Sequence, residues 1–219
     1  MQLKANLLIK AFRQNFWLNL VLLAVIFLCL IYPFYPLIRY EIKTLFKNNA
    51  KSPLSIFQKG DNSNLSNPVV KTERQKLKDT YPKNAFVQID KIEVFAPIFD
   101  GGEESSEWIL EKGVWHYPET ADFGHKGNAV IFGHRFRYMP PSSLSFYLLD
   151  KLSYGDEIKI DQGEKEYTYK VIDSKVLESY DWSISDQDLS KSLLTLVTCT
   201  PRFTTSKRLV VTAQLISSK

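Results

Sequence analysis

The segment with the residue types best suited to chemistry runs from Leu193 to Val211 and reads LLTLVTCTPRFTTSKRLVV. Its two apolar runs, separated by a polar loop, predict two β-strands and their connection. Cys199 ends the first run and Arg208 opens the second. A thiolate is a nucleophile, and a guanidinium can hold a carbonyl oxygen or stabilise an oxyanion. The segment therefore has the composition of a reactive site.

Strand periodicity predicts that these two side chains lie on the same side of the sheet, because successive side chains in a strand point to opposite faces. Alternate apolar residues form one face of each strand: Leu194 and Leu196 in the first, and Leu209, Val211, Ala213 and Leu215 in the second. If these faces line the core, Cys199 and Arg208 point away from it and lie near each other across the loop. We therefore expect a thiol and a positive charge in one outer groove.

Each of these residues also has a plainer interpretation. A free cysteine is most often a small buried hydrophobe, and Arg208 could be a strand-edge charge that pairs with an acidic residue. The second cysteine of the chain, Cys29, lies in an apolar N-terminal run, so it cannot pair with Cys199 if that run is in a membrane. A lone thiol outside the cytoplasm is exposed to oxidation, and its presence there favours a functional role.

Three histidines are candidates to move the proton that a cysteine nucleophile requires. His125 lies in a polar loop, where a solvated side chain is expected, and His116 lies between two aromatic residues, where packing is expected. His134 ends the apolar strand NAVIFGH and precedes a loop, which is where a strand delivers a side chain to a site. Position alone leaves open that His134 is a hydrogen-bonded core histidine.

Composition divides the chain of 219 residues into four parts. We expect an N-terminal segment at residues 1–13, a transmembrane anchor at 14–38, a basic polar stalk at 39–80 and a folded domain at 81–219. The predicted anchor carries no charged residue and contains the run LNLVLLAVIFLCLI, which with its aromatic and proline flanks is long enough to cross a bilayer. A cleaved signal peptide is the alternative, but no small-residue cleavage site follows the run.

Charge is distributed unevenly along the chain. Residues 1–38 carry a net charge of +3, residues 39–80 carry +5 and residues 81–219 carry −4. The folded domain is thus mildly acidic, which argues against a nucleic-acid partner, whereas the stalk suits an anionic membrane surface or wall polymer. Basic residues precede and follow the apolar run in similar numbers, so charge does not decide on which side of the membrane the domain lies.

The remaining signals in the domain predict an all-β fold. Strands are expected at residues 85–92, 93–99, 113–117, 128–134, 157–161 and 166–177, in addition to the two strands of the reactive segment. Short helical segments are expected at residues 72–78, 105–111 and 143–152, and residues 178–192 form a longer polar connection. Seven or eight short strands at this spacing predict a closed or nearly closed β-barrel.

The motif TLVTC, followed by an arginine that opens the next strand and preceded by GNAVIFGHR, resembles the sortase family of cysteine transpeptidases. The likeness extends over residues 85–215. It implies that Cys199 is the nucleophile, that His134 is the general acid and base, and that Arg208 holds the substrate and the oxyanion. Thr198 matches the residue that lines the oxyanion site beside the nucleophile.

The resemblance also implies an all-β fold with a closed eight-stranded barrel and short helices, preceded by one N-terminal transmembrane helix with the catalytic domain outside the cytoplasm. The implied substrates are surface proteins with a C-terminal LPxTG-like sorting motif, which is cleaved through a thioester. The implied acceptor is an amine of the cell wall or of a pilin lysine. No cofactor or catalytic metal is expected, although calcium could bind near Glu103, Glu104 and Glu107 if this acidic run is more than a solvated surface.

Two other functions are compatible with the sequence. One is a non-catalytic, membrane-tethered barrel that binds peptides or wall material, which has no need to retain all three reactive residues. The other is a cysteine peptidase, in which water rather than an amine resolves the thioester.

Overall fold

A computed structural model describes residues 2–49, 68–136 and 142–219, and the chain separates into two compact units, Met1–Lys47 and Asn48–Lys219. The first unit is helical, with α1 (Gln2–Ile31), the 3-10 turn η1 (Tyr32–Phe34) and α2 (Tyr35–Asn49). Prolines at positions 33 and 36 interrupt the helix because a proline lacks the backbone N–H that a helix interior needs. The stretch Phe16–Leu45 is long and apolar enough to cross a membrane.

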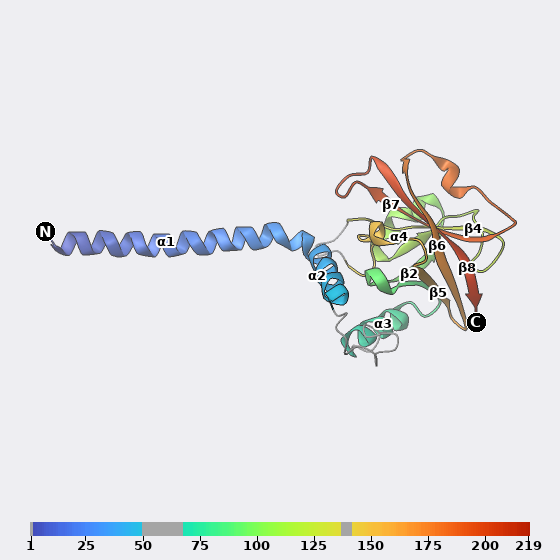
Figure 1. Ribbon diagram of the computed structural model, residues 1–219, viewed down its shortest axis with the longest axis horizontal. Coiled ribbons are helices and arrows are strands. Elements are labelled where there is room, and N and C mark those ends of the chain that lie inside the picture. Colours follow the sequence, from blue (N-terminus) through green and yellow to red (C-terminus); the bar gives the residue numbers. More distant parts are fainter. Residues whose placement is uncertain (1, 50–67, 137–141) are drawn as a thin grey trace. The chain divides into compact units, whose positions relative to one another are not determined.

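The second unit contains a closed barrel of eight strands in the order β1-β2-β3-β4-β7-β8-β6-β5 (Figure 1). The strands are β1 (Ala85–Ile89), β2 (Val94–Asp100), β3 (Val114–His116), β4 (Gly127–Phe132), β5 (Glu157–Gln162), β6 (Lys165–Glu178), β7 (Ser192–Thr200) and β8 (Lys207–Ser218). The predicted fold class, an all-β closed barrel with short helices, is therefore confirmed.

Strand β7 lies between β4 and β8 and is buried on both faces over most of its length. Its inward residues Leu194 and Leu196 are fully buried in the barrel. β7 pairs in parallel with β4 and antiparallel with β8. Because β4 and β7 are parallel, their carboxyl ends meet at the same edge of the barrel.

A second apolar cluster covers the outer side of these three strands. It consists of Val130, Ile184, Val197 and Val210, with Tyr117, Phe132 and Leu177 packed against it. Ile184 comes from the 3-10 turn η5 (Trp182–Ser185), within the connection that the sequence predicts to be polar. Asn128 holds this connection in place by donating from Nδ2 to the Ile184 carbonyl at 3.0 Å. The outer face beside the reactive segment is thus packed rather than bare.

Two local predictions are wrong. The predicted helix at residues 143–152 is a series of turns that ends in the 3-10 turn η4 (Leu149–Lys151). Part of its backbone bonds to the barrel, because Phe146 N donates to the His134 carbonyl and the Ser143 carbonyl accepts from Phe95 N. Its internal bonds, such as Leu149 N to the Phe146 carbonyl, are those of tight turns and not of an α-helix. The predicted strand at 85–92 ends at Ile89, because residues 90–92 form the 3-10 turn η2 (Asp90–Ile92).

The other helical predictions are confirmed, and the structure extends them. The 3-10 turn η3 (Glu103–Ser105) leads into α4 (Ser106–Lys112), as expected at residues 105–111. Helix α3 (Pro68–Thr80) includes the predicted segment 72–78. Residues 50–67 of the predicted stalk lie outside the described residues.

Helix α3 contacts the barrel through ion pairs and through a cation–π contact. Arg74 Nη2 lies 3.1 Å from Asp90 Oδ1, and its guanidinium lies 5.1 Å from the centre of the Phe95 ring. Lys78 forms an ion pair with Asp161 on β5. The division between stalk and domain at residue 81 stays a prediction, and these contacts belong to the segment just before it.

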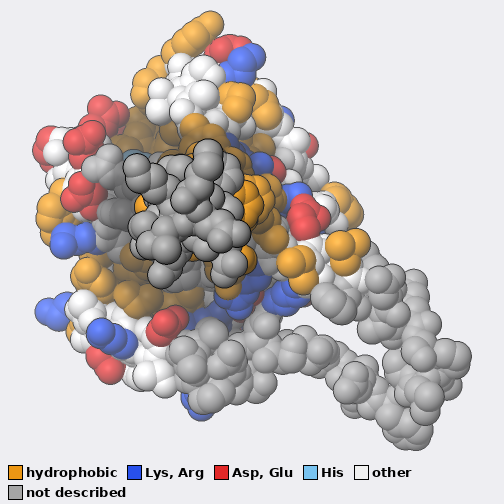
Figure 2. All heavy atoms as spheres, turned by 90° about the vertical axis from the view of Figure 1, so that its left-hand side faces the viewer, with side chains coloured by type: hydrophobic (Ala, Val, Ile, Leu, Met, Phe, Trp, Pro, Cys, Tyr) orange, Lys and Arg blue, Asp and Glu red, His pale blue; other side chains and the backbone are white. Residues whose placement is uncertain are grey.

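The face of the molecule seen in Figure 2 carries acidic and basic side chains side by side among the residues drawn in colour. No single-sign surface stands out on the described part of that face. This mixture agrees with the nearly balanced charge of the folded domain.

Candidate active site

Cys199 and Arg208 are direct neighbours across the β7 and β8 pair. Arg208 Nη1 lies 3.7 Å from Cys199 Sγ, and both residues are half-buried. The same nitrogen lies 3.0 Å from the Thr205 carbonyl oxygen and 3.2 Å from that of Lys207. The prediction that thiol and guanidinium share the outer side is therefore confirmed. Among the described residues no carboxylate pairs with Arg208, and the thiol is one of the three groups that its Nη1 contacts.

The backbone of β4 delivers His134 to the same edge. The last registered pair of the two parallel strands is Phe132 with Val197, so continued spacing brings His134 level with Cys199. Gly133 N donates to the Val197 carbonyl at 3.0 Å, which extends the pairing by one residue. The His134 carbonyl accepts from Phe146 N at 2.8 Å, and this bond fixes the residue from its other side.

Thr198 points to the opposite side of β7 from Cys199 and is buried. Its hydroxyl donates to the Gly133 carbonyl at 2.7 Å. The Thr198 hydroxyl and the Val197 carbonyl thus both bond to Gly133, and they join β7 to the segment that carries His134. The contact that Thr198 makes in the structure is a positioning contact.

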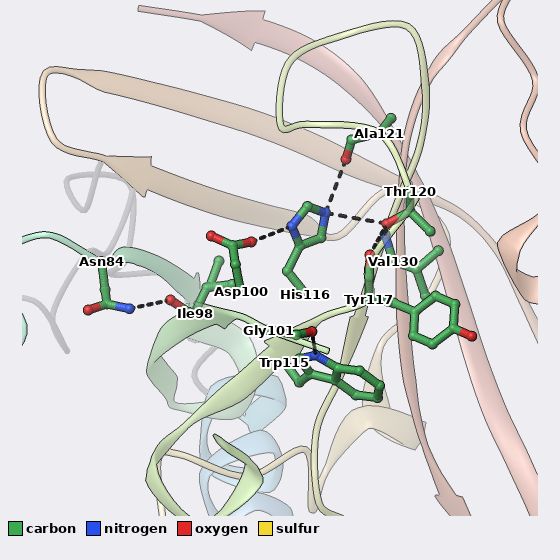
Figure 3. A network of polar contacts seen from close by, with 10 residues as sticks. All are labelled: Asn84, Ile98, Asp100, Gly101, Trp115, His116, Tyr117, Thr120, Ala121 and Val130. Atoms are coloured by element: carbon green, nitrogen blue, oxygen red, sulfur yellow. Dashed lines mark hydrogen bonds and ion pairs between the residues drawn. The ribbon is translucent and has the colours of Figure 1, made fainter. Parts of the chain in front are cut away.

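His116 is a hydrogen-bonded core histidine, as its aromatic surroundings predict. Its Nδ1 lies 2.8 Å from Asp100 Oδ1 and its Nε2 lies 3.1 Å from the Ala121 carbonyl oxygen, so both ring nitrogens are occupied (Figure 3). The hydrogen bond from His116 lowers the pKa of the Asp100 carboxyl. Through the pairs His116 with Ile131 and Ile131 with Leu196, His116 is level with Leu196 and two strands away from β7. It does not belong to the Cys199 site.

His125, the third candidate, is exposed in the loop between β3 and β4. The only backbone bond of its N–H in the described chain is to the Asp122 carbonyl, at 3.2 Å. The structure thus separates the three histidines and brings His134 alone to the edge that carries the thiol.

Three charged residues near the nucleophile were not identified from the sequence. Arg135, which follows His134, is only 5% exposed, and its Nη2 lies 2.8 Å from Asp150 Oδ1. Arg135 Nη1 lies 3.5 Å from the Cys199 carbonyl oxygen. Arg202 Nη2 contacts both oxygens of Asp150, at 2.8 and 2.7 Å. The only sequence signal for this cluster is the position of Arg135 next to a candidate histidine, since the other two residues lie in turns without periodicity.

Burial lowers the pKa of the Arg135 guanidinium, and the neighbouring Asp150 carboxylate acts in the opposite direction. An arginine remains charged at any physiological pH because its unperturbed pKa lies above about 12. The cluster therefore places a permanent buried cation behind the backbone of Cys199.

The acidic run offered as a calcium site lies in η3 and α4. Glu103 Oε1 accepts from the Tyr117 hydroxyl at 3.0 Å. Within the described ranges, no group of three or more His, Cys, Asp or Glu side chains is arranged to hold a metal ion. Calcium dependence stays a prediction.

Comparison with known proteins supports the resemblance that the motifs suggest. The Sortase domain family matches residues 87–216. The chain is 29% identical to Sortase D of Bacillus subtilis over 123 residues, which are 56% of this chain and 57% of that protein. The chain thus spans little more than half the length of this curated relative.

Solved structures give the same result. A Sortase D5 transpeptidase of Clostridium perfringens is 30% identical, with a TM-score of 0.53 over 68% of this chain and 94% of that one. Sortase E1 of Streptomyces coelicolor, solved with a tripeptide in its active site, is 27% identical, with a TM-score of 0.54 over 63% of this chain and 90% of that one.

Proposed function

Because the chain belongs to the sortase family, whose members are transpeptidases, we propose that it is a membrane-anchored cysteine transpeptidase acting on surface proteins with a sorting motif. The observation that carries the proposal is the Cys199 and Arg208 pair, with 3.7 Å between guanidinium and sulfur, at the edge to which β4 brings His134. A nucleophile, a fixed cation and a proton carrier are the groups that acyl transfer from a peptide requires.

The proposed reaction has two steps. The Cys199 thiolate attacks the carbonyl carbon of the scissile peptide bond in an LPxTG-like motif, and Arg208 stabilises the negative charge that develops on the carbonyl oxygen. The C–N bond then breaks, the leaving amine takes a proton from the His134 imidazolium, and a thioester remains. In the second step an amine of a cell-wall peptide or a pilin lysine attacks the thioester, and His134 accepts its proton. The C–S bond breaks, so the thiolate is restored and a new amide is released.

The substrate site is assigned by analogy with relatives. The Streptomyces coelicolor enzyme holds a tripeptide in its active site. We place the peptide of this chain on the outer side of β7 and β8, next to the cluster around Val197, because Cys199 and Arg208 face that side. Thr198 supports the site from the inner side through its bond to Gly133.

The proposed location rests on the first unit of the structure. Sortases are typically membrane-associated enzymes of the cell surface, and the apolar stretch Phe16–Leu45 is long enough to span a bilayer. We propose that residues 14–38 form the single span, that residues 1–13 are cytoplasmic and that the barrel lies outside the cytoplasm. A barrel in that position meets both sorting motifs and wall amines.

A library of fluorogenic sorting-motif peptides tests the function. The full chain is incubated with each peptide, with and without an amine, alongside Cys199→Ala. We expect cleavage that requires Cys199, a thioester adduct by mass spectrometry and an amine-dependent product. Cleavage that survives the loss of Cys199, or no adduct on any peptide, would contradict catalysis by this thiol. A thioester resolved by water alone would indicate a peptidase.

A further inference from the structure

Three segments that are distant in the sequence meet behind the nucleophile. They are the residue after His134, the turn η4 and the loop between β7 and β8, and they contribute Arg135, Asp150 and Arg202. Asp150 Oδ1 lies 2.8 Å from Arg135 Nη2 and 2.8 Å from Arg202 Nη2, so one carboxylate joins two arginines. The Arg202 guanidinium also lies 5.3 Å from the centre of the Tyr147 ring. The cluster has a net charge of +1.

Stability alone does not explain this cluster. Arg135 is 95% buried, and the Nε atoms of Arg135 and Arg202 are buried with no hydrogen-bond partner among the residues that the structure describes. A buried ion pair or triad often stabilises a fold no more than well-packed apolar residues of similar volume, because desolvation offsets the Coulomb attraction. Unpartnered buried N–H groups add a further cost. A buried charged cluster with unpartnered donors is expected where it supports a functional site.

The cluster reaches the nucleophile through Arg135. Its Nη1 is directed at the Cys199 carbonyl oxygen, at 3.5 Å, while Nη2 is held by Asp150. Arg135 directly follows His134 in the chain. Its planar side chain therefore connects the segment that carries His134 to the backbone of Cys199. A guanidinium suits this role because its donors form a rigid fork.

We propose that Arg135, held by Asp150, which Arg202 also binds, is a positioning residue that fixes the backbone of Cys199 against the segment carrying His134. This inference rests on the proposed function, since it assigns to Arg135 the alignment of the thiol and imidazole that perform the acyl transfer. Alignment matters because a displacement of about 1 Å at a reacting group can lower a rate by about two orders of magnitude. Arg135 itself contacts no substrate in this proposal.

The test uses Arg135→Met, which keeps the length of the side chain but lacks donors, and Arg135→Lys, which keeps the charge but loses the fork. Arg74→Met is the matched control, because Arg74 is also mostly buried, is paired with Asp90 and stacks on Phe95 on helix α3. Each full-length protein in detergent is given a fluorogenic peptide carrying Leu-Pro-any-Thr-Gly. The measurements are kcat, KM, the single-turnover rate of thioester formation and the thermal unfolding midpoint.

We expect Arg135→Met to lower kcat and the rate of thioester formation by about 10- to 100-fold, with KM within about threefold. Arg135→Lys is expected to lose most of the same rate, because charge without the fork cannot hold Asp150 and the Cys199 carbonyl together. Arg74→Met should keep its activity even where its unfolding midpoint falls as far as that of Arg135→Met.

Three results would overturn the inference. The first is a kcat within twofold of wild type in both Arg135 variants, and the second is an equal loss of rate in Arg74→Met. The third is a loss that only follows the fraction of unfolded protein. If Arg135→Met does not fold, Arg135→Lys decides by the same criteria. A wild-type protein that forms no thioester with any library peptide contradicts the proposed function, whereas normal acylation in the Arg135 variants contradicts only the positioning role.

Discussion

At the scale of single residues, the site depends on what the Arg208 guanidinium contacts. The backbone carbonyls of Thr205 and Lys207 accept from Nη1, and the same nitrogen lies 3.7 Å from Cys199 Sγ. Its orientation is thus set before a substrate arrives, and electrostatic stabilisation of a transition state is strongest when the charged donor needs no reorganisation.

Replacing Arg208 by Lys retains the charge but removes the planar guanidinium whose Nη1 lies against these carbonyls. We expect kcat/KM on the cleaved peptide to fall by about 100-fold, comparable to the removal of one oxyanion donor. Lys207→Gln is the matched control, because Lys207 is the adjacent exposed cation and its partner is Glu178. Steady-state kinetics on both variants check this. Equal effects of the two substitutions would show that overall charge, and not the position of Arg208, matters.

A second residue-scale prediction concerns alkaline stability. Tyr169 is buried, its hydroxyl accepts from Gly124 N at 2.8 Å, and burial raises its pKa to about 12. In the unfolded chain a tyrosine ionises near pH ~10, so the contribution to stability is fully present below that pH and is lost as the pH rises towards 12.

Tyr169→Phe should therefore cost about 1 kcal/mol at pH 8, where it leaves the Gly124 N–H without a partner. Its stability relative to wild type should rise between pH ~10 and ~12, because only the wild type loses this contribution. Urea unfolding at several pH values measures the difference, and Tyr154→Phe, at an exposed ring, serves as the control. A difference that does not change with pH would contradict the assignment.

At the scale of elements, the parallel pairing of β4 and β7 assembles the site. Both strands run to the same edge, and the bonds of Gly133 to Val197 and Thr198 continue their register past the last residue of β4. The turns before η4 then close the edge, since Phe146 N bonds to the His134 carbonyl. His134 is thus held by backbone contacts from two directions.

Gly133 is needed for this close approach. A Cβ atom at this position would lie 2.6 Å from Phe146 Cδ2, and Phe146 is fully buried and cannot move into solvent. We expect Gly133→Ala to lower kcat at least 10-fold and to cost about 1–3 kcal/mol of stability, as overpacking does. Adding Phe146→Leu makes room and should restore part of both. Kinetics and thermal unfolding of the single and double variants test this, and a double variant no better than Gly133→Ala would argue against steric crowding.

At the scale of the whole molecule, the two units have different surfaces. The first exposes apolar side chains along Phe16–Leu45, and the second buries most of its apolar residues in the barrel and in the outer cluster. Helix α3 belongs to the second unit and contacts the barrel through Arg74 and Lys78. Membrane attachment and chemistry are therefore expected to be separable.

A chain of residues 68–219 should remain in the aqueous phase and cleave the fluorogenic peptide with a kcat/KM within a few-fold of the full-length protein. A chain of residues 81–219 lacks α3, and we expect it to be less stable by about 1–2 kcal/mol, from the lost ion pairs and the Arg74 and Phe95 contact. Membrane fractionation, peptide kinetics and thermal unfolding check these expectations. Loss of activity in the 68–219 chain at full stability would show that the first unit takes part in the reaction.

The sequence alone determined the class of the fold and placed Cys199 and Arg208 on one face of their strands. Alternating apolar residues specify strands and their inner faces, so the orientation of Cys199 and Arg208 followed from a period of two. The apolar N-terminal run could also be predicted from the sequence, because its length and its lack of charge do not depend on the rest of the fold. The family motifs then distinguished His134 from His116 and His125, a choice that position alone left open.

Only the tertiary structure decided what lies around that pair. The Glu178 to Ser192 connection appears polar, but Ile184 packs on Val197, because burial depends on which face a loop covers and not on its average composition. The expected helix at 143–152 gives way to turns, and part of its backbone bonds to the barrel edge. Arg135, Asp150 and Arg202 come together from three segments, and a contact between residues far apart in sequence leaves no periodic signal in any one of them.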